Sequence, residues 1–365
     1  MDPESGYPCS RTVSPLRPAN LPFGETSLMA RPWLRKCPFR RHLFFSLMPC
    51  DDLQMTPDLR TPAGHPISAY CFGTMQWGGK SDPADSQAMY DAARAVGINF
   101  FDTAHGYTGG ASEHLLGEFA APERDDVFIA TKCASTGNCA PEAIAKDFDE
   151  SLKRLDVEFV DMLYMHRWSD DVPLEATYEA LAKMVDSGRV RHIGVSNYSA
   201  WQVMKAAGVA ASLDLKIEML QPMYNLVKRQ AEVEILPMCT SESIAVVPYS
   251  PLGGGLLTGK YNLGKDGRLT HDPMYKSRYG QEWMHRAANS LQELAAEIGV
   301  SAITLAIAWV AQNPAVTAPI LSASRSEQLK PSLDAIGFEM DDEIYARLTA
   351  LTPTPPPATD RSEEA

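Results

Sequence analysis

The chain has 365 residues, of which 45% are hydrophobic and 22% charged, an ordinary composition for a globular enzyme. Its net charge of −13 argues against a nucleic-acid partner, because binding to phosphate backbones relies on Lys and Arg. No run of about eighteen apolar residues occurs, which argues against a membrane span. The seven cysteines form no CxxC pair and no histidines cluster at metal-ligand spacing, so we expect no metal and no disulfide framework. A reduced, cytoplasmic setting fits these features best.

The first 57 residues differ in composition from the remainder of the chain. They are rich in Pro, Ser and Arg and hold few acids before Asp51, as an organellar transit peptide does. A true start at Met48 or Met55 is the alternative that we favour. We expect a disordered extension or misassigned start over 1–57, one catalytic domain over 58–352 and a disordered tail over 353–365.

Short apolar runs then recur, most of them about thirty residues apart, which is the size of a βαβ unit. In chain order they are AYCFGTM (69–75), INFFDT (98–103), VFIATK (127–132), VDMLYMH (160–166), VRHIGVS (190–196), IEMLQ (217–221), IAVVPYS (244–250) and TAPILS (317–322). Helical patterns lie between them, such as DSQAMYDAARAVG, PEAIAKDFDESLKRL and LEATYEALAKMVDSG. Eight strands alternating with helices predict a parallel (β/α)8 TIM barrel.

A doubly wound open sheet is the alternative architecture. It would need a glycine fingerprint after the first strand, and the segment Gly73-Thr74-Met75-Gln76-Trp77-Gly78 does not supply GxGxxG. The longest gap runs from Ser250 to about Thr317 and holds a glycine-rich loop and more helix than one crossover requires. In a barrel, an insertion at this end of a strand covers the ligand.

Four titratable residues stand at or just after the ends of successive strands, where a barrel places its active site. They are Asp102, Tyr107, Lys132 and His166. A free tyrosine is a poor acid at neutral pH, and we expect a neighbouring Lys132 ammonium to lower the pKa of Tyr107. Asp102 can supply the anionic partner that a buried lysine needs, and His166 can hold a substrate carbonyl. Taken singly, each residue is more often a cap or a satisfied core group.

The motifs FDTAHGY (101–107), IATK (129–132), LYMHRW (163–168), IGVSNYS (193–199) and VPYSPLGGGLLTGKY (247–261) resemble those of the aldo-keto reductase superfamily. The resemblance covers about residues 58 to 350, and the bacterial-type reductases and potassium-channel β subunits are similar. It implies that Tyr107, Asp102, Lys132 and His166 form a catalytic tetrad in which Tyr107 donates the proton. The implied reaction is reduction of an aldehyde or ketone by hydride transfer from NADPH.

The same resemblance implies a cofactor site. Ser196, Asn197 and Gln221 would hold the nicotinamide carboxamide, Tyr249 would stack on the ring, and Arg325 would bind the 2′-phosphate. The remaining expected cofactor residues are Thr74, Ser250, Pro251, Leu252, Gly254, Lys260, Ser322, Ala323, Ser324 and Gln328. The chain departs from the family pattern at Ser322, usually glycine, and at Pro331-Ser332, usually Glu-Asn, which puts the preference between NADP and NAD in doubt.

Aromatic residues near strand ends are the candidates for a substrate pocket. We expect it to be lined by Trp77, His105, Arg167, Trp168, Tyr198 and Tyr224. Arg167 can attract a carboxylate or phosphate, or it can pair with Asp170. The expected partner is a small carbonyl compound, and the chain is expected to be a monomer or weak homo-oligomer. The alternative function is a nucleotide-sensing regulatory protein of the channel β-subunit type on the same fold.

Overall fold

The computed structural model describes residues 57–361 and 363, so the segment 1–56, in which a transit peptide or late start is expected, lies outside the described residues. Contacts divide the chain into Met1–Asp52 and Leu53–Ala365, and the second unit carries all the helices and strands described below. Residues 353–361 of the expected tail carry no helix or strand.

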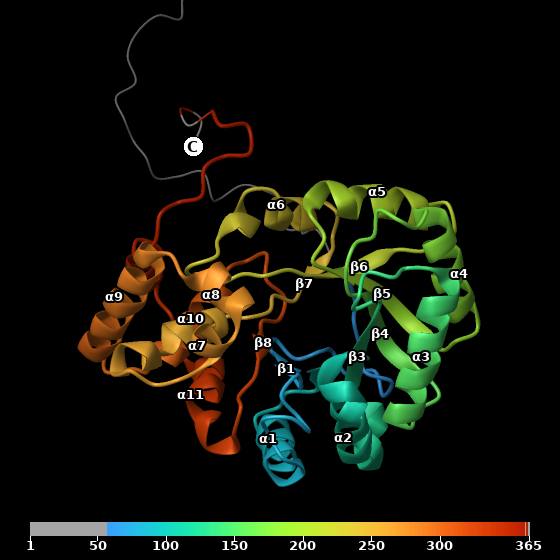
Figure 1. Ribbon diagram of the computed structural model, residues 1–365, viewed down its shortest axis with the longest axis horizontal. Coiled ribbons are helices and arrows are strands. Elements are labelled where there is room, and N and C mark those ends of the chain that lie inside the picture. Colours follow the sequence, from blue (N-terminus) through green and yellow to red (C-terminus); the bar gives the residue numbers. More distant parts are fainter. Residues whose placement is uncertain (1–56, 362, 364–365) are drawn as a thin grey trace, which may run out of the picture. The chain divides into compact units, whose positions relative to one another are not determined.

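Eight strands form one parallel sheet (Figure 1). They are β1 (Cys71–Gly73), β2 (Phe100–Asp102), β3 (Phe128–Cys133), β4 (Val160–Met165), β5 (Val190–Ser196), β6 (Ile217–Gln221), β7 (Ala245–Val246) and β8 (Ile320–Leu321). Each lies within the apolar run that predicted it, except that β3 extends one residue further, to Cys133. The order β7-β6-β5-β4-β3-β2-β1-β8 places the last strand beside the first, as in a (β/α)8 fold.

The ladders end at β7 and β8, yet backbone hydrogen bonds also link the segments that contain these strands. The amides of Thr317 and Ala318 donate to the carbonyl of Val246 at 2.8 and 3.2 Å, and the amide of Ile320 donates to that of Pro248 at 3.0 Å. The sheet is therefore curled, with its two outer strands near each other.

Helices follow the strands along the chain (Figure 1). They are α1 (Pro83–Ala95), α2 (Ala111–Ala120), α3 (Pro141–Leu155), α4 (Leu174–Asp186), α5 (Ala200–Ala211), α6 (Ile235–Ser241), α7 (Arg268–His271), α8 (Pro273–Tyr279), α9 (Glu282–Ile298), α10 (Ala302–Gln312), α11 (Lys330–Leu333) and α12 (Asp342–Thr349). Four of them, α7 to α10, fill the long gap between β7 and β8, which confirms that this insertion exceeds one crossover. None of the described helices is long and apolar enough to cross a membrane alone, and α9 with α10 pass that test only as a pair bent by 100°.

Alternate positions along the strands divide the core into two layers. Cys71, Phe100 and Phe128 belong to a cluster inside the curled sheet, whereas their neighbours Phe72, Phe101 and Ile129 belong to a larger cluster with the helices.

A glycine at position 194 lets the inner cluster close. A Cβ atom there would lie 2.6 Å from the ring of Tyr164 and 2.9 Å from the carbonyl oxygen of Met219. Because the Tyr164 ring fills the interior at this level, β5 can lie this close to it only if residue 194 has no side chain.

Candidate active site

Three of the four predicted catalytic side chains meet through hydrogen bonds at the carboxyl ends of β2 and β3. The Lys132 Nζ atom lies 2.6 Å from Asp102 Oδ2, 2.6 Å from the carbonyl oxygen of Thr103 and 3.2 Å from the Tyr107 hydroxyl. Lys132 is fully buried and Asp102 is 2% exposed, whereas Tyr107 is half-buried. The ammonium group therefore connects a buried carboxylate to a phenol that faces the mouth of the site.

Burial and charge act in opposite directions on these groups. Burial alone would lower the pKa of Lys132, but the Asp102 carboxylate and Tyr107 raise it above its ordinary value, so the side chain stays charged. Burial raises the pKa of Tyr107 more than the Lys132 ammonium lowers it. Lys132 thus lowers the pKa of Tyr107 as expected, but the resulting pKa lies above the ordinary value because burial acts more strongly. Tyr107 is protonated at neutral pH, which is the form that can donate a proton.

His166, the fourth predicted catalytic residue, follows β4 and lies edge-on to Tyr107. The ring centroids are 6.0 Å apart and the planes meet at 81°. Burial, with the positive charges of Lys132 and Arg167, lowers the pKa of His166 to about 3, so the imidazole is neutral. Its Nδ1 atom is buried and has no hydrogen-bond partner in the part of the chain that the structure describes. A neutral imidazole beside Tyr107 can exchange a hydrogen bond with a polar group of a substrate.

Arg154 of α3 holds the loop that carries Tyr107 in place through a backbone contact. Its Nη1 atom donates to the carbonyl oxygen of His105 at 2.9 Å and lies 3.2 Å from the fully buried Glu113, whose other oxygen accepts from Thr131 at 2.7 Å. The His105 side chain itself pairs with Glu150 at 2.9 Å, so it anchors the loop and does not line a pocket. Thr131 precedes Lys132, and the network thus ties the lysine strand to the tyrosine loop. Sequence reasoning missed Arg154 and Glu113, because neither stands at a strand end.

The four residues expected at the nicotinamide are brought to the same edge of the sheet. Asn197, in a left-handed conformation (φ 60°), donates from Nδ2 to the carbonyl oxygen of His166 at 3.0 Å and accepts from the Tyr249 hydroxyl at 2.7 Å. Gln221 donates from Nε2 to Asp102 Oδ1 at 2.8 Å, and the Ser196 hydroxyl donates to the carbonyl oxygen of Gln221 at 3.0 Å. In this structure Gln221 thus also supports the catalytic aspartate.

The loop after β7 forms a glycine-lined cradle. Gly254 and Gly255 have φ angles of 64° and 97°, and a Cβ atom on Gly254 would lie 2.7 Å from the ring of Tyr275 in α8. Ser250 also has a positive φ, its carbonyl oxygen accepts from Asn225 at 2.8 Å, and Pro251 is buried while Leu252 is half-buried. A side chain at position 254 would collide with the ring of Tyr275, so this close approach of the loop to α8 requires a glycine.

Three cations, Lys80, Lys260 and Arg268, gather near this cradle. Burial and the charge of Arg268 lower the pKa of Lys260. Burial, Arg268 and Lys260 lower the pKa of Lys80, and the nearby Asp272 offsets this only in part. No ion pair joins any of the three to an acid within residues 57–361. A cluster of mutually repelling cations fits a bound polyanion such as a pyrophosphate. Lys80 and Arg268 were not among the predicted residues, since each stands in a loop or short helix with no strand-end signal.

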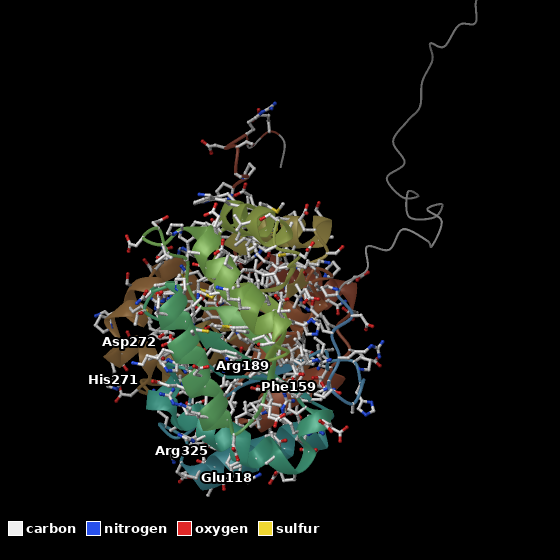
Figure 2. The ribbon with its side chains drawn as sticks, turned by 90° about the vertical axis from the view of Figure 1, so that its right-hand side faces the viewer. Glu118, Phe159, Arg189, His271, Asp272 and Arg325 are labelled. Carbon is white, nitrogen blue, oxygen red and sulfur yellow. The ribbon has the colours of Figure 1, made fainter. Side chains whose placement is uncertain are left out.

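The loop after β8 carries the residues expected at the adenosine. The carbonyl oxygen of Ser324 accepts from the Ser81 hydroxyl at 2.9 Å, and Arg325 is exposed at the surface (Figure 2). Ser322 is half-buried and Gln328 is exposed. Arg325 precedes only the 3-10 turn η6 (Ser326–Gln328), which is followed by the four-residue α11. No long helix therefore begins at Arg325 to add a helix dipole to its charge.

Thr74 has a supporting position under the site. Its buried hydroxyl donates to the carbonyl oxygen of Asp102 at 3.1 Å and lies 2.7 Å from the Ser112 hydroxyl. Those contacts occupy the oxygen, so Thr74 stabilises the end of β2.

The expected substrate pocket is corrected at two residues besides His105. Trp77 is 1% exposed and packs against Phe72, Tyr90 and Phe119, so it belongs to the layer between sheet and helices. Tyr224 is also fully buried, and its hydroxyl donates to Glu232 at 2.8 Å. Both aromatic side chains turn inward, because the loops that follow their strands fold back onto the core.

Tyr198, Trp168 and Arg167 remain near the His166 end of the site. Tyr198 is 3% exposed and lies edge-on to Trp168, with centroids 5.2 Å apart. The Trp168 Nε1 atom donates to Asp170 at 2.7 Å, and the expected alternative pairing of Arg167 with Asp170 is not formed. The exposed Arg167 has no ion pair among the described residues.

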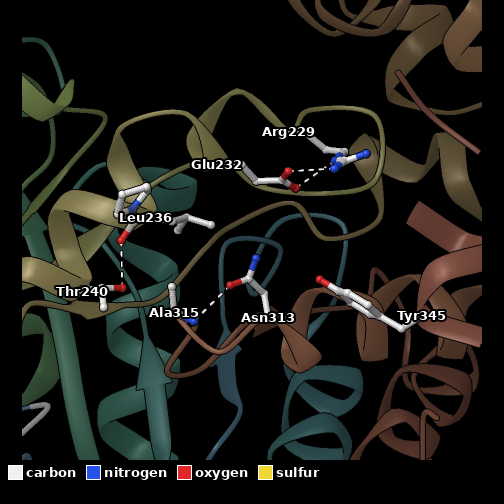
Figure 3. Close-up of a pocket in the computed structure, with 8 residues that line it drawn as sticks. Arg229, Glu232, Leu236, Thr240, Asn313, Ala315 and Tyr345 are labelled. Atoms are coloured by element: carbon white, nitrogen blue, oxygen red, sulfur yellow. Dashed lines mark hydrogen bonds and ion pairs between the residues drawn. The ribbon is translucent and has the colours of Figure 1, made fainter. Parts of the chain in front are cut away.

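A separate hollow of about 330 Å³ contains none of the predicted site residues. It is lined by Arg229, Glu232, Leu236, Pro237, Thr240, Asn313, Ala315 and Tyr345 (Figure 3). Arg229 and Glu232 pair at 2.8 Å, and Arg229 also donates to the carbonyl oxygen of Thr349. The charged groups that line this hollow are therefore paired within the protein, which indicates a structural role for them.

A curled parallel sheet with a Tyr–Lys–Asp–His cluster at its carboxyl edge defines a class of oxidoreductase. The model of the Aldo/keto reductase family matches residues 69–353, and the chain belongs to this family. It is 34% identical to a probable voltage-gated potassium channel subunit beta of Arabidopsis thaliana, over 75% of this chain and 89% of that protein. It is 33% identical to the uncharacterized oxidoreductase YrpG of Bacillus subtilis (79% and 93%) and 31% identical to the norsolorinic acid reductase of Emericella nidulans (78% of each).

Proposed function

We propose that the chain reduces aldehyde or ketone carbonyls to alcohols with NADPH, and that Tyr107 is the general acid. The observation that carries the proposal is the protonated Tyr107 hydroxyl 3.2 Å from the buried Lys132 ammonium, with the neutral His166 ring beside it. A proton donor next to a fixed cation and a neutral polar group matches what carbonyl reduction requires at the substrate oxygen.

The residues present fit a nicotinamide dinucleotide. Lys80, Lys260 and Arg268 lie together beside the glycine-rich loop after β7 and offer charge to a pyrophosphate. Asn197 and Tyr249 stand together at the catalytic end, as expected for the nicotinamide side. The cofactor, when bound, supplies the hydride.

The chain's own residues would handle the proton. Tyr107 donates its hydroxyl proton to the carbonyl oxygen as negative charge develops there, and the Lys132 ammonium stabilises the phenolate that remains. Asp102 holds the ammonium in place and balances its charge in the buried site. His166, neutral because its pKa is about 3, can hold the carbonyl oxygen without competing as an acid.

A closed barrel is part of this proposal. The hydrogen bonds from Thr317, Ala318 and Ile320 to the β7 segment support closure between β7 and β8. Closure would place all eight strand ends around one mouth, as the convergence of catalytic and cofactor residues requires.

A nucleotide-sensing regulatory role is the second candidate, and the similarity to the Arabidopsis channel β subunit supports it. The two roles differ in turnover. A sensor binds the dinucleotide without sustained reduction of a carbonyl, whereas an enzyme consumes it stoichiometrically with alcohol formation.

The test is an NADPH-consumption screen over aldehydes, ketones and pyridoxal, run beside Tyr107→Phe. Turnover by the wild type that falls by about 10²–10⁴-fold in the variant is the expected result. Binding of NADPH with no turnover of any carbonyl would overturn the enzyme proposal in favour of the sensor.

A further inference from the structure

The first helix of the domain contacts the loop that follows the last strand. Asp85, in the first turn of α1, accepts a hydrogen bond from the amide of Ser326 at 3.1 Å and a second from the Ser326 hydroxyl. Ser81, just before this helix, donates to the carbonyl oxygen of Ser324 in the same loop. Residues about 240 positions apart thus share one junction, beside Arg325.

The junction carries a fixed negative charge. Hydrogen bonds from the Ser326 hydroxyl and amide, together with the charge of Arg325, keep the pKa of Asp85 below its ordinary value. The carboxylate is therefore ionised at neutral pH. Arg325 is exposed and pairs with no acid within 4 Å in the described segment, so Asp85 acts on it through space.

We propose that Asp85 is a specificity-determining residue that weakens the preference of this chain for NADPH over NADH. The inference rests on the proposed function and on the assignment of Arg325 to the 2′-phosphate. That phosphate, with a charge near −2, would meet a carboxylate beside its cationic partner. Asp85 also occupies the amide and hydroxyl of Ser326, which are donors that a phosphate could use.

The 2′-hydroxyl of NADH experiences neither penalty. It is neutral, so the Asp85 carboxylate does not repel it. Asp85 should therefore weaken the binding of NADPH and leave the affinity for NADH nearly unchanged. If the contact between α1 and the loop had only a structural role, its loss would change the affinity for both cofactors alike.

The variants separate charge from contact. Asp85→Asn removes the charge but keeps an oxygen that can accept from Ser326, whereas Asp85→Ala removes both. Asp91→Asn is the matched control, because Asp91 lies on the same helix and accepts only from Gln87 among the described side chains. Thermal melting of each variant checks that the fold is retained.

The measurement is the dissociation constant of NADPH and of NADH, obtained by quenching of tryptophan fluorescence at low and at high salt. We expect Asp85→Asn to tighten NADPH binding by roughly two- to fivefold at low salt, the range of an exposed charge interaction. NADH affinity should stay the same, the gain should shrink at high salt, and Asp91→Asn should match the wild type.

Two results would overturn the inference, and they are distinguishable. If the wild type binds both cofactors and Asp85→Asn leaves their affinity ratio unchanged, Asp85 has no part in specificity while the proposed function stands. If the wild type binds neither cofactor, the proposed function fails and the inference fails with it.

Discussion

The Asp102–Lys132 pair can be tested by its effect on stability, independently of catalysis. Lys132→Met keeps the volume of the side chain but removes the ammonium that contacts Asp102 and Thr103, each at 2.6 Å. The Asp102 carboxylate would remain 2% exposed, with Gln221 as its remaining side-chain donor. Removing one partner of a buried ion pair costs about 3–5 kcal/mol, so we expect the free energy of unfolding to fall by that amount.

The double variant Lys132→Met/Asp102→Asn tests the physical reason. With both charges gone, no uncompensated carboxylate remains, and replacement of a whole buried pair is often close to neutral. We expect the double variant to recover most of the loss, although both variants lack carbonyl reduction. The non-additivity should therefore appear in stability and not in activity.

The assay is urea denaturation of the wild type, both single variants and the double variant, followed by circular dichroism and tryptophan fluorescence. Coincident transitions are needed for the free energies to be compared. If the double variant loses the sum of the two single losses, the charges do not interact in the way that their contact implies.

Three further outcomes are expected. Tyr107→Phe should lower turnover by about 10²–10⁴-fold while NADPH affinity is retained. Tyr178→Phe is the control, because it removes a buried hydroxyl that has no described partner, and it should leave turnover unchanged. Equal effects of the two variants on turnover would refute the role of Tyr107. The pKa of His166 is about 3 in the folded protein, so stability is lost as the pH falls below about 6.5, because the unfolded state takes up the proton first. His166→Gln should remove about 2 kcal/mol of that loss between pH 6.5 and 5, as measured by urea titrations at each pH. If the variant loses as much free energy of unfolding over this range as the wild type, the low pKa of His166 is refuted. Arg325→Ala should weaken NADPH binding by roughly ten- to hundredfold and leave NADH binding unchanged in fluorescence titrations, whereas equal loss of both cofactors would place the 2′-phosphate elsewhere.

The strands and the catalytic cluster could be predicted from the sequence because both rest on local signals. Each strand is a short apolar run, and Asp102, Lys132 and His166 each end such a run or directly follow it. Parallel strands bring their carboxyl ends together without further information. The pairing of β2 with β3 brings Asp102 near Lys132, and the loop after β2 brings Tyr107 to the same ammonium group.

What the sequence could not predict is the direction in which some side chains point and the net pKa of a group under opposing effects. Trp77 and Tyr224 follow strands and are aromatic, but whether such a ring faces the mouth or the core depends on how the loop folds back. The pKa of Tyr107 depends on two opposing effects, and only the folded structure shows that desolvation of the phenol outweighs the charge of Lys132. The Asp85–Ser326 contact joins residues 241 positions apart, and no local pattern indicates it.

Charge is distributed differently in the two halves of the site. At the catalytic end, Lys132 is neutralised within the protein by Asp102, so its position is set before any ligand binds. At the cradle, the charges of Lys80, Lys260 and Arg268 repel one another, Asp272 offsets this only in part, and no acid of the described chain forms an ion pair with them. The first arrangement favours a fixed geometry for proton transfer, because preorganised charges need not rearrange during the reaction. The second arrangement favours a polyanion, since a bound anion lowers the repulsion among these cations and should therefore stabilise the α7–α8 insertion that supplies Arg268.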